Sequence, residues 1–180
     1  MKVKKLTTMA VMTALSIVLI ALLHFPIFPA APFLEYDPAD IPILLVSFIF
    51  GPIEGLCVTV VASVLQGITV SSGSNIYGVI MHILATGTYV LTAGLIWKYG
   101  KKTPFKAAVA LAFGAVAMTV MMIGANLLIT PYFMKVEVKV VQGMLLPVII
   151  PFNLIKSGVN GALTFILYMP LSKEWKRLNR

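Results

Sequence analysis

Long apolar stretches, separated by short polar or basic segments, constrain this chain more than any other feature. Residues 6–23 hold no charge, and residues 144–170 hold a single one, Lys156. An α-helix needs about 20 mostly apolar residues to cross a bilayer, whereas the strands of a transmembrane barrel alternate polar and apolar residues. Because these stretches are apolar without alternation, the sequence predicts an all-α membrane protein.

Composition agrees with a bilayer environment. Charged residues make up 11% of the chain, against about 25% in soluble domains. A net charge of +8 could indicate nucleic-acid binding in a soluble protein, but here Lys and Arg cluster beside hydrophobic segments, as the positive-inside rule describes. We therefore expect the lipid bilayer, and no nucleic acid, as a partner. One cysteine excludes an internal disulfide, and two histidines are too few to predict a metal site.

We expect a single integral membrane domain over residues 1–180, with six transmembrane helices. Their approximate ranges are 6–24, 39–50, 52–70, 76–97, 105–129 and 145–171. Half of the six acids, Glu35, Asp37 and Asp40, lie with four prolines in residues 25–40, which predicts a loop there. Residues 71–75 are rich in Ser and Gly and predict a turn.

Positive charge decides whether residues 41–70 form one helix or two. Basic residues gather at the N-terminus, in residues 98–106 and at the C-terminus. If all three clusters are cytoplasmic, an even number of spans must separate each pair. A break at Gly51-Pro52 satisfies that condition. We therefore expect both termini in the cytoplasm, and the 25–40, 71–75 and 131–144 segments on the outer side.

A few polar side chains inside the apolar stretches predict a binding site. A charge such as Lys156 at membrane depth costs at least ~2.5–3.5 kcal/mol, and Asn153 lies one turn earlier on the same helix face. Asn126 lies near the outer end of its own helix. These positions predict a pocket that captures a solute from outside. Two structural alternatives remain open: an ion pair of Lys156 with a loop acid such as Glu35, and an interhelical hydrogen bond for Asn126.

Sequence motifs of enzymes are missing from the chain. It contains no GxxxxGK[ST], HExxH or GxSxG motif, so we do not expect an enzyme. Ala10 and Ala14 in the first helix have a small-xxx-small spacing, which permits close approach of another helix, although Ala is common in helices generally.

Five segments together resemble the substrate-binding S components of energy-coupling factor (ECF) vitamin transporters, most closely their riboflavin-specific branch. They are Leu6-Thr7-Thr8-Met9-Ala10 with the Ala10/Ala14 pair, Glu35-Tyr36-Asp37-Pro38-Ala39-Asp40-Ile41-Pro42, Phe50-Gly51-Pro52 followed by Gly55, Asn126 followed by Pro131-Tyr132, and Pro151-Phe152-Asn153-Leu154-Ile155-Lys156. The resemblance spans nearly the whole chain. One departure is Ser157, where a small residue, often Gly, would be expected.

The resemblance implies the S-component fold and a function in vitamin uptake. Such a subunit binds riboflavin with high affinity from outside a prokaryotic cell membrane, with the 25–40 loop as a lid. It docks through helix 1, at Ala10 and Ala14, onto a transmembrane coupling subunit that carries two ATPase subunits. Riboflavin would be the transported ligand and not a cofactor. The alternatives are another vitamin or FMN as ligand, or, in a different class, a membrane-embedded enzyme or scaffold subunit.

Flavin chemistry suggests roles for the site residues. The pyrimidine edge of the ring needs a donor and acceptors, which the Asn153 and Asn126 amides offer, and Lys156 could donate to a ring carbonyl or a ribityl oxygen. Tyr36 could form an aromatic wall. Glu35 or Asp40 could accept from the ribityl hydroxyls, and residues near the start of the fourth helix could add further contacts. The full expected set of ligand-binding residues is Asn153, Lys156, Asn126, Glu35, Tyr36, Asp40, Asn75, Tyr77 and Gly78. FMN remains an alternative ligand. Its phosphate would need Arg or several Lys at the rim of the pocket, and Lys135 and Lys139 lie near it in the sequence.

Overall fold

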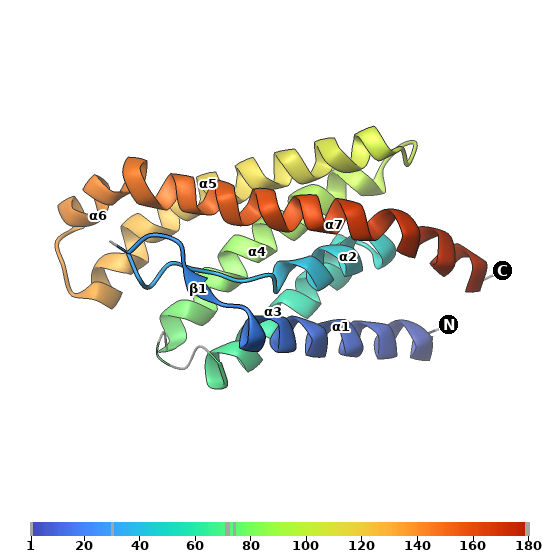
Figure 1. Cartoon of the computed structure of the whole chain (residues 1–180), viewed down its shortest axis with the longest axis horizontal. Coiled ribbons are helices and arrows are strands. Elements are labelled where there is room, and N and C mark those ends of the chain that lie inside the picture. The colour runs from blue at the N-terminus through green and yellow to red at the C-terminus, as the bar shows by residue number, and fades with distance from the viewer. Residues whose placement is uncertain (1, 30, 71–72, 74, 179–180) are drawn as a thin grey trace.

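Within the described residues, six helical segments run roughly along the long axis of the molecule (Figure 1). The computed structural model describes residues 2–29, 31–70, 73 and 75–178, so Ser71, Ser72 and Ser74 of the predicted turn lie outside the described residues. The elements are α1 (Lys2–Leu22), β1 (Phe25–Pro26), β2 (Glu35–Tyr36), α2 (Asp40–Phe50), α3 (Pro52–Ile68), α4 (Asn75–Lys98), α5 (Pro104–Met134), α6 (Val138–Met144), η2 (Leu145–Ile149) and α7 (Ile150–Leu178). Because α6, η2 and α7 follow one another without a break, they form one helical segment, and the expected all-α fold with six helices is confirmed.

Four segments are long and apolar enough to cross a membrane: Val3–Leu22, Asn75–Lys98, Pro104–Met134 and Val138–Leu171. The other two, α2 and α3, have 11 and 17 residues. At 1.5 Å per residue, α2 extends only about 16 Å. Gly51 separates α2 from α3 with a φ of 132°, a conformation that glycine adopts easily, and Pro52 begins α3. The predicted break at Gly51-Pro52 is therefore present.

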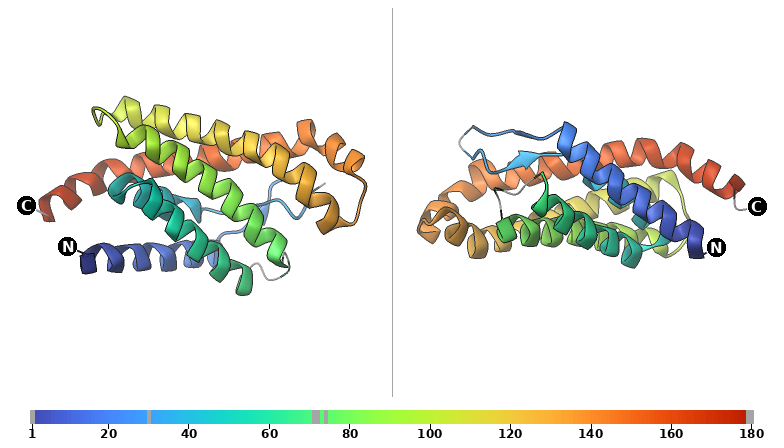
Figure 2. Two further views of the ribbon diagram at one scale, coloured as in Figure 1. Left: turned by 180° about the vertical axis from the view of Figure 1, so that it is seen from behind. Right: turned by 90° about the horizontal axis from the view of Figure 1, so that it is seen from below.

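The two ends of the bundle differ in what they carry. Both chain termini and the turn between α4 and α5 lie at one end, which we call the terminal end (Figures 1 and 2). The segment between α1 and α2 lies toward the opposite end, the loop end, with α6 and the turn that precedes it. This is the arrangement that the three basic clusters predict.

Two predicted helix boundaries are wrong. α5 continues past residue 129 to Met134 with Pro131 inside it. Proline lacks only its own N–H donor, and the Pro131 carbonyl still accepts hydrogen bonds from Lys135 N and, at 3.1 Å, from Val136 N. The last helix begins at Val138 and not at 145, so the predicted 131–144 loop shrinks to residues 135–137. The last helical segment then widens into a π-helical turn at Leu145–Ile149, which contains Pro147.

α2 lies at the centre of the bundle. All of its residues from Asp40 to Phe48 are buried, and it contacts α1, α3, α4 and α7. At the terminal end, the Phe48 ring stacks on Trp97 with centroids 5.2 Å apart, and Tyr168 meets both rings edge-on. The Trp97 Nε1–H donates to Phe48 O at 3.1 Å. These contacts close the terminal end with packed aromatic side chains.

A second, smaller apolar cluster covers the loop end. Ala31 and Leu34 from the loop pack with Val141, Val148, Ile149 and Phe152 from the last helical segment. The short β1–β2 ribbon pairs Phe25 with Tyr36 and Pro26 with Glu35, which gives this segment a defined path. The loop is therefore held against the last helical segment, whose α7 part carries both Asn153 and Lys156.

Close packing at Gly94 yields a test of this arrangement. A Cβ at Gly94 would lie 3.1 Å from Pro52 Cα and would collide with the Ser47 hydroxyl. Gly94→Ala should therefore lower the free energy of unfolding by about 1–3 kcal/mol, as overpacking does. Unfolding in detergent, followed by circular dichroism, measures the change. The matched control is Gly124→Ala, because nothing lies within 4 Å of a Cβ there; equal stability of the two variants would contradict the packing described.

Candidate functional site

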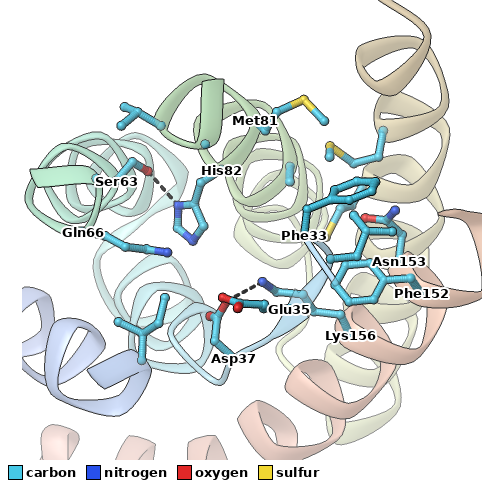
Figure 3. A pocket seen from close by; sticks show the side chains of 18 residues that line it. Phe33, Glu35, Asp37, Ser63, Gln66, Met81, His82, Phe152, Asn153 and Lys156 are labelled. Atoms are coloured by element: carbon cyan, nitrogen blue, oxygen red, sulfur yellow. Dashed lines mark hydrogen bonds and ion pairs between the residues drawn. The ribbon is translucent and has the colours of Figure 1, made fainter. Parts of the chain in front are cut away.

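A cavity of about 140 Å³ lies near the loop end, between α3, α4, α5, α7 and the loop (Figure 3). Its wall combines apolar side chains, such as Phe33 and Met81, with polar groups from several elements. The polar side chains are Glu35 and Asp37 from the loop segment, Ser63 and Gln66 from α3, His82 from α4, and Asn153 and Lys156 from α7. A small molecule with both ring and hydrogen-bonding groups would suit such a wall.

A second cavity, of about 110 Å³, adjoins the first. The two share Phe33, Leu34, Gly78, Met81 and Met122. The second is lined mainly by apolar and aromatic groups, among them Tyr77 and Phe133, and Asn126 adds an amide. Phe133 is the centre of an aromatic group, because the rings of Phe33 and Tyr77 lie 6.2 and 6.0 Å from it. The pair of cavities thus has a polar part and an aromatic part.

Lys156 forms a buried ion pair with Asp37. Lys156 Nζ donates to Asp37 Oδ2 at 2.6 Å, and only 10% and 5% of the two side chains are exposed. The alternative of an ion pair with a loop acid therefore holds, although the partner is Asp37 and not Glu35. Burial, the largest single influence, would raise the pKa of Asp37, but the Lys156 and His82 charges and the hydrogen bonds from Lys156 and Ala39 N together outweigh it, so the pKa is lowered. The ion pair thus persists until the pH falls below the ordinary range of aspartate.

Asp40 and Asn160 extend this pair into a buried network. Asn160 Nδ2 donates to Asp37 O and to Asp40 Oδ2, both at 3.0 Å. Thr86 Oγ1 donates to Asp40 Oδ1 at 2.6 Å, and His82 Nε2 lies 3.7 Å from the same oxygen. The network joins the loop to α2, α4 and α7. Asp40 is buried within it and lines neither cavity, so the structure does not bring Asp40 to the expected ribityl position.

Tyr36 is also drawn into the network. Its hydroxyl donates to Asn160 Oδ1 at 3.0 Å, and its ring lies 5.4 Å from Phe25. Burial and the Asp37 carboxylate raise the pKa of Tyr36, which keeps this donor protonated. Tyr36 lines neither cavity, and the nearby ring that does so is Phe33.

The two asparagines contribute to different cavities. Asn153 lines the first, and its Nδ2 donates to Ile149 O at 2.8 Å. Among the described residues, Asn153 Oδ1 has no hydrogen-bond partner, so it is free to accept. Asn126 lines the second cavity, but its amide bonds within its own helix, to Met122 O at 2.8 Å and from Thr130 Oγ1 at 2.9 Å. The interhelical bond considered for Asn126 is absent from the described residues.

The remaining expected residues lie around the rim or elsewhere. Glu35 is exposed and lines the first cavity, Tyr77 lines the second, and Gly78 lines both. Asn75 lines neither; it begins α4 with a positive φ of 50°. Ala10 and Ala14 are both exposed on α1 and line neither cavity. Ser157, the departure from the family pattern, is buried, and its hydroxyl donates to Asn153 O at 2.6 Å.

Sequence reasoning missed several polar residues of the site. Asn160 could have been found, because residues 153, 156, 157 and 160 follow the spacing of one helix face. His82 was assigned no role, yet it lines the first cavity and its Nδ1 lies 2.7 Å from Ser63 Oγ. Gln66 had no sequence signal. Among the described residues, no group of three His, Cys, Asp or Glu side chains is placed to hold a metal ion.

The fold and the cavities define a helical membrane protein that can hold a small molecule inside its bundle. Comparison with known proteins narrows this class. A family described as "ECF transporter, substrate-specific component" matches residues 4–168, and the chain therefore belongs to that family. It is a family of substrate-binding components of transporters, not of enzymes.

Individual relatives match over nearly the full length. The chain is 32% identical to "Riboflavin transporter FmnP" of Bacillus subtilis, with 97% of this chain and 95% of that protein covered. It is 31% identical to "Riboflavin transporter RibU" of Staphylococcus aureus, with 97% and 94% covered. A solved structure, described as the S component of a bacterial ECF transporter, superposes with a TM-score of 0.84 at 32% identity and covers 98% of this chain and 99% of its own. The expected S-component fold is confirmed.

The ion pair of the site generates a stability prediction. Lys156→Met leaves the Asp37 carboxylate buried without its partner and should cost about 3–5 kcal/mol of unfolding free energy. Asp37→Leu should cost a similar amount, because it strands Lys156. The double variant should recover much of the loss, which a double-mutant cycle measured by unfolding in detergent would detect. Additive losses would show that the two charges do not depend on each other.

Proposed function

We propose that this chain is the riboflavin-binding subunit of an ECF-type importer, which captures the vitamin outside the cell and passes it to an ATP-driven module. The observation that carries the proposal is that Asn153 and Lys156 line one cavity and that the adjoining cavity is lined by aromatic and Met side chains. The full-length relatives named as riboflavin transporters support the choice of vitamin.

A flavin ring matches the polar groups of this wall. The pyrimidine edge carries carbonyl acceptors and one N–H donor, and Asn153 Oδ1 is available to accept from that donor. Lys156 Nζ has three protons and gives one to Asp37, so it can donate another to a ring carbonyl. The rings of Phe33, Tyr77 and Phe133 supply the apolar contacts for the aromatic body of the ligand.

The proposed orientation places the cavities on the outer side of a prokaryotic cell membrane. Both termini and the basic 98–106 segment would then face the cytoplasm. The 25–40 loop would act as a lid, because Ala31 and Leu34 cover the cavities from the loop end through contacts with α6, η2 and α7. In the proposed cycle, ligand enters when this apolar contact opens.

ATP hydrolysis would occur on partner chains. The partners are a transmembrane coupling subunit and two ATPase subunits, and α1 would dock on the coupling subunit. Ala10 and Ala14 support this assignment because both are exposed on α1 and their small side chains permit close helix contact.

FMN is supported less well than riboflavin. Lys135 and Lys139, which could have bound its phosphate, are exposed and line neither cavity. Two carboxylates, Glu35 and Asp37, line the first cavity instead. Because a phosphate beside these groups would be repelled, an uncharged ribityl chain suits the cavity better.

Flavin binding provides the direct test. Protein purified in detergent with riboflavin should be yellow and should quench flavin fluorescence on titration. Asn153→Ala should weaken binding by more than ~1 kcal/mol, because it removes a partner from a buried polar edge. The control is Gln142→Ala, which removes an exposed amide that lines neither cavity. Colourless protein that gives no titration would refute riboflavin as the ligand.

Docking through α1 predicts a separation of binding from uptake. Replacing Ala10 and Ala14 together with Leu should abolish vitamin uptake by cells, since the larger side chains block helix contact, while the purified variant keeps its flavin affinity. Val116→Leu with Val120→Leu on α5 is the control, because these residues are also exposed. If the Ala10/Ala14 variant lost flavin binding, the α1 face would be part of the fold and not a docking surface.

A further inference from the structure

The side chain of Gln66 is the one polar group of the first cavity's α3 wall that the described structure leaves unused. Only 9% of Gln66 is exposed, and it lines the cavity. Among the described residues, no side-chain hydrogen bond satisfies its amide. Figure 3 shows the amide extending from α3 into the space between His82 and Asp37. Since no fully buried side-chain nitrogen or oxygen of the described residues lacks a hydrogen-bond partner, the free amide atoms of Gln66 are accessible from the cavity. A ligand group in the cavity could therefore form hydrogen bonds with them.

The neighbours of Gln66 determine what kind of group fits. His82 and Ser63 lie beside it on the same wall, and Asp37 and Glu35 approach from the loop. Most of these groups are already committed, since His82 Nδ1 lies 2.7 Å from Ser63 Oγ and Asp37 binds Lys156. The wall therefore offers a free amide donor and acceptor beside carboxylate acceptors. A hydroxyl both donates and accepts, so a chain of hydroxyls fits this wall better than an anion or an apolar group.

The wall formed by Gln66 and His82 lies where it could bind the side chain of a ligand whose ring is held elsewhere in the cavities. Asn153 and Lys156 project from α7 on the side of the cavity opposite to Gln66 and His82 (Figure 3), and the aromatic second cavity adjoins through Phe33 and Met81. A ring held by α5 and α7 would direct its substituent toward α3 and α4. We propose that Gln66, supported by His82, forms a polyol-binding subsite that makes the protein select flavins with a hydroxylated side chain. This inference rests on the proposed flavin function and adds a specificity determinant to it.

Comparing the binding of two flavins that share one ring system distinguishes the contribution of the polyol subsite from that of the ring-binding site. Riboflavin carries the ribityl chain, and lumiflavin has a methyl group in its place. Gln66→Met keeps the length of the side chain and removes the amide. It should weaken riboflavin binding roughly five- to thirtyfold, as loss of one or two buried hydrogen bonds does, and leave lumiflavin affinity within about twofold. Fluorescence titration of the full chain in detergent measures both.

A control variant and the lumiflavin measurement distinguish loss of the subsite from loss of folding. Gln142→Met, at the other glutamine of the chain, should change neither affinity, because Gln142 is exposed on α6. Retained lumiflavin binding shows that Gln66→Met is folded. Equal losses for both flavins, or no loss for riboflavin, would overturn the subsite while leaving flavin binding intact. If the unmodified protein bound neither flavin, the proposed function would fail and the subsite with it.

Discussion

The buried ion pair between Lys156 and Asp37 is the interaction on which the site depends. A charge in the middle of an apolar helix is tolerated only with a partner, and here that partner comes from a loop. Asn160 and Asp40 continue the connection, so the segment between α1 and α2 is fixed to α2, α4 and α7. The loop's position over the cavities follows from satisfying this one charge.

Apolar packing complements the polar network. Ala31 and Leu34 rest on the last helical segment, and the π-helical turn at Leu145–Ile149 lies immediately before the residues that line the cavity. Such turns often occur at functional sites. The carbonyl of Ile149, at the end of this turn, accepts the Asn153 amide proton. The π-helical turn therefore helps to orient the Asn153 side chain, which lines the cavity.

Much of the fold could be predicted from the sequence, because the signals are local. The long apolar stretches predict the helices, Gly51-Pro52 predicts the break between α2 and α3, and the basic clusters predict which segments lie at the same end of the bundle. The face shared by Asn153 and Lys156 follows from helix geometry alone, and both residues line the first cavity. The partners of these residues were harder to predict. Tyr36 and Asp40 were expected at the ligand, yet both bind Asn160, since the path of the loop sets which acid or ring faces inward and no periodicity encodes that path. Pro131 was misinterpreted for a different reason: a proline removes only its own N–H donor, and the Pro131 carbonyl still accepts hydrogen bonds from the residues that follow.

The network also joins parts of the chain that are made at very different times. Lys156 and Asp37 are 119 residues apart, and Asn160 and Tyr36 are 124 apart. During synthesis, the loop with its buried acids exists before the helix that neutralises and covers them. The ligand cavity therefore cannot be completed until the last helix has entered the membrane, and a chain that stops before α7 would carry its acids without a counter-charge.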